Sequence, residues 1–165
     1  MPDNAIKTFH LEMLNRDDLI PKRGSLNFAT AVVNPPDPDL NRQLYQQVGS
    51  MWQWTDRLTW DDHQWNEYVT RSSLNTWVGY WRGERAGYFE LESQHNGNVE
   101  IMYFGLLPEY IGLGLGGIML TAAIESAWLN PGTRRVWVHT CTNDHKHALE
   151  NYLQRGFQLF KTETE

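Results

Sequence analysis

The sequence has very little cysteine and a shortage of basic residues. Cys141 is the one cysteine among 165 residues, so no intrachain disulfide can form. Lys and Arg number 14 against 20 Asp and Glu, which gives a formal net charge of −6. Proteins that bind nucleic acid along its phosphate backbone need a basic surface. We therefore expect no nucleic-acid partner, and a cationic small molecule is the more natural one.

Long apolar runs are also lacking. No apolar stretch approaches the length of a membrane span, and residues 1–23 contain no apolar signal-peptide core. We therefore expect a cytoplasmic protein without a membrane partner. Aromatic residues, in contrast, are abundant, with eight Trp, seven Tyr and six Phe in a chain that is 41% hydrophobic. This composition and length predict one folded domain over residues 1–165, built around a single core.

Periodicity and turn signals predict an α/β fold with a mixed, mostly antiparallel sheet. Asn96-Gly97 is a strong hairpin signal, and three consecutive strands there lead into a strand-helix-strand unit. Asp37 before Pro38 predicts one helix start, and Thr59 with Asp62 three residues later predicts a second. The expected strands are Thr8–Leu14, Asn75–Trp81, Ala86–Leu91, Asn98–Phe104, Val136–Val138 and Phe157–Phe160, and the expected helices are Pro38–Met51, 60–68, Gly117–Trp128 and Asp144–Arg155.

A glycine-rich stretch, Gly112 to Gly117, lies between a predicted strand and a predicted helix. Glycine permits positive φ and close approach of a ligand, and the N–H groups that begin a helix attract anions. A pyrophosphate is the expected ligand. The pattern also fits a dinucleotide-binding loop, but six residues separate it from its strand, and His139 stands about 20 residues on, where an acid should hold the ribose. A glycine turn without a ligand is the third possibility.

The stretch from Val99 to Leu120 resembles the signature motif of the GNAT acetyltransferases, with Leu106-Leu107-Pro108 followed by the glycine loop. A second segment, Ala148 to Phe157, is similar to the A-x-x-x-Y-x-x-x-G-F segment of that family. Three features depart from the pattern. Ile111 replaces the usual Arg or Gln, His145 stands where Asn is frequent, and the chain ends soon after the sixth expected strand, although the family usually adds a seventh.

The resemblance implies an N-acetyltransferase that uses acetyl-CoA as cosubstrate and a primary amine as acceptor. It implies a GNAT-like sheet of six to seven strands with about four helices. An incomplete sheet would make a homodimer reasonable. The residues that the resemblance assigns to coenzyme binding are Phe104, Leu106, Leu107, Ile111, Gly112, Leu113, Gly114, Leu115, Gly116, Gly117, Asn143 and His145.

Two residues are candidates for the proton transfers that acetylation requires. An alkyl amine with a pKa of about 10 needs a proton acceptor. Glu100 occupies the place of the catalytic glutamate of histone-acetylating relatives, and simple alternation predicts that it shares a strand face with Phe104 and Leu106. It could instead be a cross-strand or solvated carboxylate. Tyr152 matches the family tyrosine that donates a proton to the departing thiolate, or it is a core residue. A backbone N–H near Phe104 would meet the oxyanion.

In this family the acceptor pocket forms from the first two helices, their connecting loop and the adjacent strands. The corresponding substrate-binding candidates are Trp54, Arg57, Trp60 and Glu90, and Trp52 and Glu92 lie in the same region.

Histidines and the cysteine are clustered between His139 and His147, but their spacing fits no standard zinc site. We therefore expect no metal, with His139 and Cys141 near the thiol end of the coenzyme. Two other functions stay open: a non-catalytic acyl-CoA-binding module and, more remotely, a nicotinamide-dependent oxidoreductase.

Overall fold

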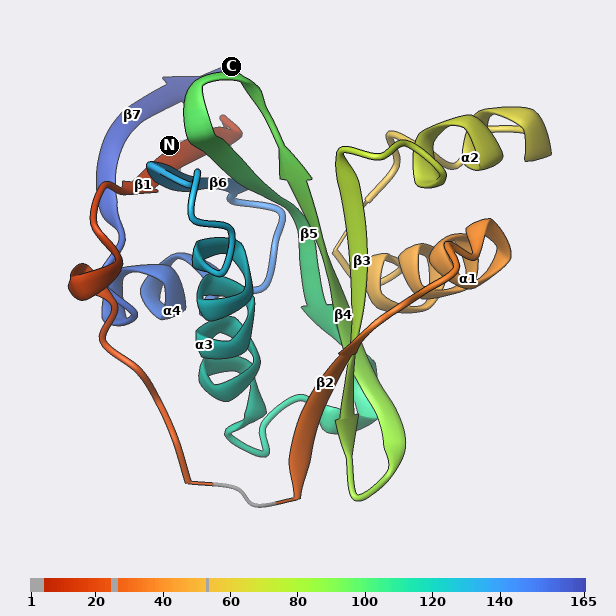
Figure 1. Cartoon of the computed structure of the whole chain (residues 1–165), viewed down its shortest axis with the longest axis horizontal. Helices are drawn as coiled ribbons and strands as arrows, with labels where there is room; N and C mark the ends of the chain where they lie inside the picture. Colours follow the sequence, from red (N-terminus) through yellow and green to blue (C-terminus); the bar gives the residue numbers. More distant parts are fainter. Residues whose placement is uncertain (1–4, 25–26, 53) are drawn as a thin grey trace.

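The computed structural model describes residues 5–24, 27–52 and 54–165. Seven strands form one sheet in the order β2-β3-β4-β5-β6-β1-β7, and four α-helices flank it (Figure 1). The strands are β1 (Lys7–Met13), β2 (Phe28–Val32), β3 (Leu74–Trp81), β4 (Glu84–Ser93), β5 (Asn98–Leu106), β6 (Arg135–Cys141) and β7 (Gln158–Thr164). The helices are α1 (Pro38–Gly49), α2 (Asp62–Val69), α3 (Leu115–Trp128) and α4 (Ala148–Gln154).

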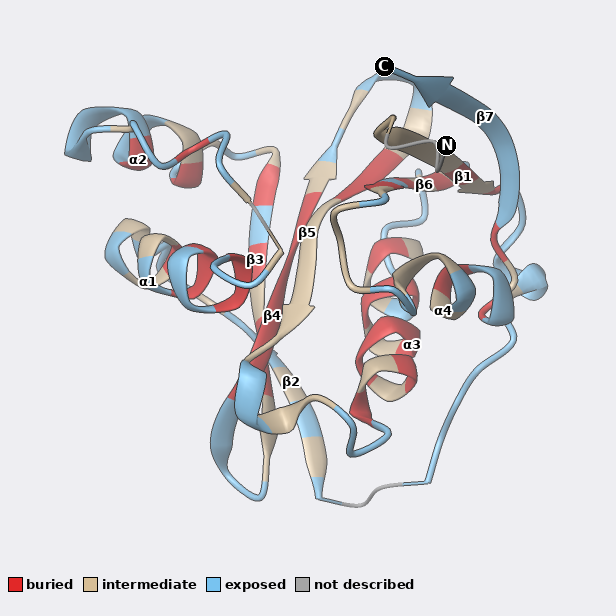
Figure 2. Cartoon of the chain, turned by 180° about the vertical axis from the view of Figure 1, so that it is seen from behind, coloured by how far each residue is buried: buried red, intermediate tan, exposed pale blue. Residues whose placement is uncertain are grey.

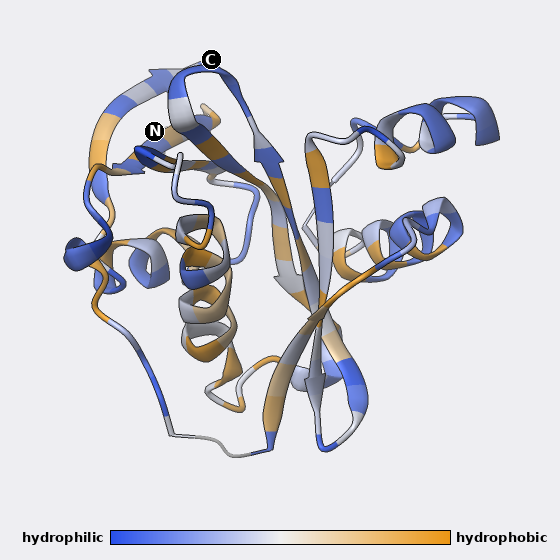
Figure 3. Cartoon of the chain, in the orientation of Figure 1, coloured by the Kyte–Doolittle hydropathy of each residue, from blue (hydrophilic) through white to orange (hydrophobic). Residues whose placement is uncertain are grey.

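The helices lie in pairs on opposite sides of the central strands, with α1 and α2 on one side and α3 and α4 on the other (Figures 1 and 2). The largest core packs α3 against β4, β5, β6 and β1. Leu120 and Ile124 of α3 are completely buried there, and most of the helix is drawn in orange and white in Figure 3. Two smaller cores, around Leu44 and Trp65, attach α1 and α2 to the opposite face. The predicted α/β class and element numbers are confirmed.

Local side-chain chemistry sets the helix starts. Asp37 accepts a hydrogen bond from the backbone N of Leu40 (3.1 Å), as the sequence predicts. The second prediction was wrong by two residues, because Asp61 and Gln64, rather than Thr59 and Asp62, form the reciprocal capping box of α2.

Three further helix boundaries differ from the expectation. Helix α1 ends at Gly49, so Met51 lies beyond it and is exposed, and α3 begins two residues early, at Leu115. Helix α4 begins only at Ala148. Asp144 is hydrogen-bonded into a turn at the end of β6, which leaves it outside the helix.

The seventh strand comes from the N-terminal part of the chain. Strand β2 is not among the strands predicted from the sequence; it is a five-residue edge strand that exposes three of its residues. At the other edge, β1 lies between β6 and β7 and pairs antiparallel with both. One chain thus forms a complete seven-stranded sheet, and no strand from a second copy is needed.

A bulge in β5 divides its side chains between the two faces. Leu91 of β4 is opposite Ile101 and Glu90 is opposite Tyr103, which leaves Met102 as an extra residue. Ile101 and Phe104 therefore both face α3, whereas Glu100 and Tyr103 face the side of α1 and α2. The expectation that Glu100 shares a face with Phe104 and Leu106 is wrong, because the extra residue reverses the alternation.

Strands β5 and β6 separate at their carboxyl ends. Their parallel pairing covers Asn98–Ile101 and Arg135–Val138, and beyond these residues the two strands diverge without pairing. The backbone N of Leu107 donates to Ala86 of β4 (2.7 Å). By the alternation of an antiparallel ladder, the N–H groups of Phe104 and Leu106 point away from β4 and into the opening.

We predict that the N-terminal strand is essential to the stability of the domain. Leu11 is completely buried in β1, so Leu11→Ala should lower the free energy of unfolding by about 2–5 kcal/mol. Leu14→Ala, just outside the strand at a 60% exposed position, should cost less than about 0.5 kcal/mol. Urea denaturation followed by tryptophan fluorescence measures both. Equal, small losses would show that β1 is not part of the cooperative unit.

Candidate active site

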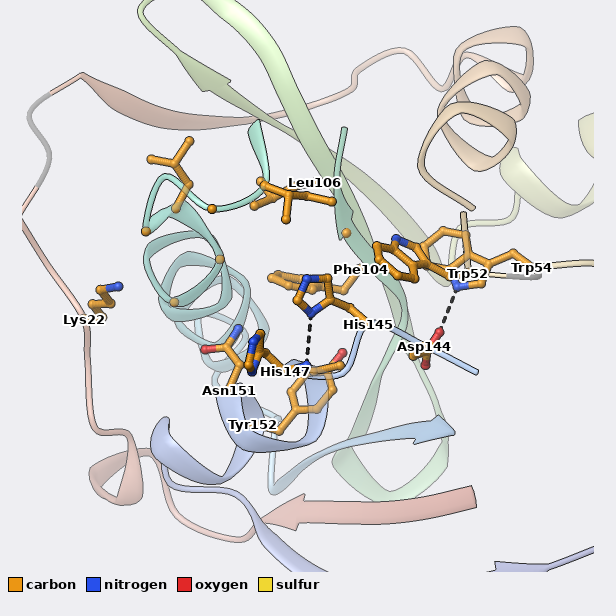
Figure 4. A pocket seen from close by; sticks show the side chains of 18 residues that line it. Lys22, Trp52, Trp54, Phe104, Leu106, Asp144, His145, His147, Asn151 and Tyr152 are labelled. Carbon is orange, nitrogen blue, oxygen red and sulfur yellow. Dashed lines mark hydrogen bonds between the residues drawn. The ribbon is translucent and has the colours of Figure 1, made fainter. Parts of the chain in front are cut away.

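A cavity of about 260 Å³ opens where β5 and β6 diverge (Figure 4). The glycine loop and the first turn of α3 form one end, α4 and the turn before it form another wall, and Trp52 and Trp54 from the α1–α2 loop close the opposite end. The residues that line it are Lys22, Trp52, Trp54, Phe104, Gly105, Leu106, Ile111, Gly112, Gly114, Leu115, Gly116, Gly117, Asp144, His145, His147, Ala148, Asn151 and Tyr152.

Most of the predicted coenzyme residues line this cavity. They are Phe104, Leu106, Ile111, Gly112, Gly114, Leu115, Gly116, Gly117 and His145. Leu107, Leu113 and Asn143 do not, since Leu107 packs against the core under α1 and Leu113 is half exposed on the loop. Six further lining residues are not among those predicted from the sequence: Lys22, Gly105, Asp144, His147, Ala148 and Asn151.

The glycine loop has the geometry of an anion-binding site. Gly112 and Gly114 have φ of 87° and 77°, which explains why glycine stands at both positions. A Cβ at Gly112 would meet no atom within 4 Å, so the backbone there is open to a ligand. No side chain caps α3, because its N-cap residue is Gly114. The N–H groups of its first turn therefore face the cavity without a competing acceptor from the cap, an arrangement that fits a diphosphate.

Tyr152 joins α4 to the open end of β5. Its ring contacts Phe104 at 6.3 Å and Phe157 at 5.9 Å between centroids. Burial raises the pKa of the phenol well above its ordinary value of about 10, and the negative charge of Asp144 acts in the same direction. The hydroxyl therefore stays protonated at neutral pH and carries a proton that it could donate.

Asp144 connects the cavity wall to the α1–α2 loop. Its Oδ1 accepts a hydrogen bond from Nε1 of Trp54 (3.0 Å), and its Oδ2 accepts hydrogen bonds from Thr140 and from the backbone N of Cys141 (3.3 Å). Trp52 packs edge-on against His145, with ring centroids 4.9 Å apart. A carboxylate at the carboxyl end of a strand beside a topological opening is the signal that could have identified Asp144 from the sequence.

Glu100 lies on the other face of the sheet and does not line the cavity. Its side chain is buried, with Oε1 accepting from Nε2 of Gln94 (2.9 Å) and Oε2 at 3.2 Å from Nδ1 of His139. The His139 ring is 46% exposed, and its pKa is raised above the ordinary value. The hydrogen bond to Glu100 is the main cause; burial opposes the shift, and the charges of Glu100, Asp144 and Asp56 add to it.

Arg57 and Glu90 bind each other rather than facing the cavity. Their side chains form two hydrogen bonds, of 3.0 and 3.1 Å, and both are buried. The Glu90 carboxylate also accepts from Asn41 and from Tyr68, both at 3.0 Å. Trp60 lies 4.9 Å from the Arg57 guanidinium. Of the four substrate candidates, only Trp54 lines the cavity, and the other three connect the α1–α2 loop to the sheet.

The described residues contain neither a cluster of metal ligands nor a helix suited to a bilayer. Within residues 5–24, 27–52 and 54–165, no three His, Cys, Asp or Glu side chains are grouped so as to hold a metal ion. In the same ranges, no helix combines the length and apolarity required to cross a bilayer.

We predict that the buried Arg57–Glu90 pair stabilises the domain. Arg57→Ala leaves the Glu90 carboxylate buried without its cation and should lower the free energy of unfolding by about 3–5 kcal/mol. Arg42→Ala removes the exposed contact of Arg42 with Asp62 and should cost less than about 1 kcal/mol. Chemical denaturation of the two variants makes the comparison. A small loss for Arg57→Ala would mean that Glu90 is solvated or protonated once its partner is gone.

Known proteins similar to this chain agree on one fold. A GCN5-related N-acetyltransferase from Kribbella flavida is 15% identical with a TM-score of 0.69, over 97% of this chain and 58% of its own. A GCN5-related N-acetyltransferase from Sphaerobacter thermophilus is 12% identical with a TM-score of 0.74, over 97% of this chain and 50% of its own. The chain thus spans about half the length of either protein. An aminoglycoside acetyltransferase from an uncultured soil metagenomic sample is 14% identical with a TM-score of 0.63, over 78% of this chain and 87% of its own.

At these identities the three structures establish the fold alone. A search of curated protein sequences finds no match. The model of the acetyltransferase (GNAT) family matches residues 39–157, which include the glycine loop, the divergent ends of β5 and β6, and Tyr152. This match covers well over half of the sequence, and the chain belongs to the GNAT acetyltransferase family.

Proposed function

We propose that this protein transfers an acetyl group from acetyl-CoA to a primary amine of a small cationic acceptor. The observation that carries the proposal is a single cavity that joins the glycine loop to the open end of β5 and then to Trp52, Trp54 and Asp144. A ternary complex needs such continuity, because the donor and the acceptor must meet at one point.

The coenzyme fits the glycine-loop end of the cavity. When bound, acetyl-CoA supplies an acyl thioester as the electrophile. The uncapped N–H groups of the first turn of α3 would hold its diphosphate, and the absence of side chains at Gly112 and Gly116 leaves room for close approach. The N–H groups of Phe104 and Leu106, which face the opening, would stabilise the developing oxyanion.

The Glu100–His139 pair is the proposed proton acceptor. Glu100 contacts Nδ1 of His139, which leaves Nε2 to take a proton. Neither side chain lines the cavity, so a bridging water would carry the proton from the attacking amine to the ring. The buried carboxylate orients the ring and stabilises the imidazolium that forms. Tyr152, on the opposite side of the opening, would return a proton to the leaving thiolate. The bulge at Met102 allows the proton acceptor and the proton donor to lie on opposite sides of the opening, since it directs Glu100 and Phe104 to opposite faces of the sheet.

Charges and rings at the Trp52 end favour a cationic acceptor. Asp144 lies in the cavity wall, and Asp56 accepts a hydrogen bond from Tyr103 on the same side of the sheet (3.4 Å). Carboxylates and tryptophan faces both attract ammonium groups. The fold neighbour from soil is named for aminoglycosides, which carry several amino groups, so polyamines and amino sugars come first in an acceptor screen.

We predict that acetyl-CoA binds at the glycine loop. Calorimetric titration should give micromolar binding to the wild type and none for NADH. Gly116→Trp should abolish acetyl-CoA binding, because the new ring would fill the cavity. The variant should still fold, because Gly116 is helical and its backbone tolerates a side chain. Glu125→Trp is the control variant: it introduces the same side chain at an exposed position near the other end of α3, and it should bind acetyl-CoA with wild-type affinity. Absence of binding by the wild type would sink the proposed function. Binding without transfer to any amine in the screen would favour the non-catalytic alternative.

We predict an acetylation rate that increases with pH. The imidazole of His139 must be neutral to accept a proton, and its pKa is raised, so the rate should rise as the pH passes through a value above about 6.5.

The raised pKa of His139 also links the Glu100–His139 pair to stability. The pair stabilises the fold fully below a pH of about 6.5, and this contribution is lost as the pH rises through the raised pKa.

Variants at the pair test this interpretation. His139→Gln should lower the rate by about 10²–10⁴-fold. Glu100→Gln should move the acidic limb of the pH–rate profile to lower pH, because the hydrogen bond that mainly raises the pKa is weakened. Glu92→Gln is the matched control, since Glu92 also accepts from Gln94 but does not pair with His139. An unchanged profile in Glu100→Gln would refute the pairing as the proton acceptor.

A further inference from the structure

The glycine loop lacks the basic side chain that its motif resemblance leads one to expect, because Ile111 occupies that position and lines the cavity with an apolar surface. Two cations from distant parts of the sequence lie beside the same turn. Lys22 comes from the segment between β1 and β2, and Arg155 follows the last residue of α4. Both approach the first turn of α3 at Gly117.

Lys22 reaches the glycine loop from the N-terminal segment. It lines the cavity, and Figure 4 shows its side chain directed toward the first turn of α3. Its Nζ lies 3.6 Å from the position that a Cβ on Gly114 would take, and its Cδ lies 2.6 Å from the corresponding position on Gly117. Within the described residues, no carboxylate forms a salt bridge with Lys22, so its charge is available to an anion in the cavity.

Among the described residues, no carboxylate pairs with the buried guanidinium of Arg155. Only 8% of the residue is exposed, and its Nε is buried without a hydrogen-bond acceptor among the described residues. Burial lowers the pKa of the guanidinium, which reflects the cost of keeping this charge out of water. One of its Nη atoms lies so close to Gly117 that any side chain there would collide with it. An anion beside α3 would offset that cost.

The backbone holds the two cations together. The N of Ile20 donates to the carbonyl of Arg155 (2.9 Å), and the N of Lys22 donates to Oγ1 of Thr121 (2.9 Å). The same hydroxyl donates to the carbonyl of Gly117 in α3 (2.8 Å). The segment after β1 is thus attached to the end of α4 and to α3, and its position follows from the insertion of β1 between β6 and β7.

We propose that Lys22 binds the diphosphate of acetyl-CoA and, with the charge of Arg155 behind Gly117, replaces the basic residue that is missing at position 111. This inference rests on the proposed function, since it assumes the same ligand in the same cavity. Lys22 would act as a point charge at the cavity wall, whereas the Arg155 guanidinium, which does not line the cavity, would add positive charge from the buried side of Gly117. Helix α3 adds the positive end of its dipole between them.

Calorimetric titration of acetyl-CoA tests the proposal through Lys22, which is exposed and can be changed without disturbing the core. Lys22→Gln should weaken binding about ten-fold, and Lys22→Arg should restore most of the affinity. Arg23→Gln is the matched control, because it removes the same charge from the next residue, whose guanidinium pairs with Glu125 outside the cavity. It should leave affinity within about two-fold.

Acetyl-dephospho-CoA, which keeps the diphosphate but lacks the 3′-phosphate, identifies the group that is bound. The ten-fold loss in Lys22→Gln should persist with this ligand, and raising the salt concentration should weaken binding to the wild type more than binding to the variant. A loss that disappears with acetyl-dephospho-CoA would overturn the diphosphate assignment. Equal affinities of Lys22→Gln and Arg23→Gln would refute the role of Lys22 while leaving the proposed function intact. If wild type does not bind acetyl-CoA, both proposals fall.

Discussion

The separation of β5 from β6 is the constraint on which the rest of the site depends. Parallel strands that stayed paired to their ends would satisfy every N–H and C=O between them and leave no opening. Here the pairing stops at Ile101 and Val138, and the backbone beyond must find other partners or face a ligand. The cavity, the directed N–H groups of Phe104 and Leu106, and the access from both faces of the sheet all follow from that break.

Such an opening needs structural support on both faces of the sheet, and different interactions provide it on each face. Apolar packing of α3 supports the side of the glycine loop, where Leu120 and Ile124 are completely buried. On the other face the α1–α2 loop is attached by the Arg57–Glu90 ion pair within a ring of aromatic side chains, including Tyr68 at 4.0 Å from the guanidinium. A buried ion pair has strict geometry, and this rigidity positions Trp54 against Asp144.

The parts of this structure that sequence reasoning predicted are those governed by local chemistry. The glycine loop, the Asp37 cap and the Asn96-Gly97 hairpin each depend on residues within a few positions of one another. The failures involve distant residues. Nothing near Arg57 in the sequence shows that Glu90 neutralises it, and one extra residue at Met102 reverses the faces of β5. Lys22 is separated from the loop that it approaches by more than half the chain.

The proposed site explains how a protein with a net negative charge could bind an anionic coenzyme. With a formal net charge of −6, the chain as a whole repels a polyphosphate, so cations must be concentrated where the phosphates bind. Lys22, Arg155 and the positive end of α3 provide this at one end of the cavity, whereas Asp144 lies toward the other. Under the proposed function, a cavity polarised in this way would orient an anionic donor and a cationic acceptor head to head. Their reactive groups would then meet at the point where β5 and β6 part.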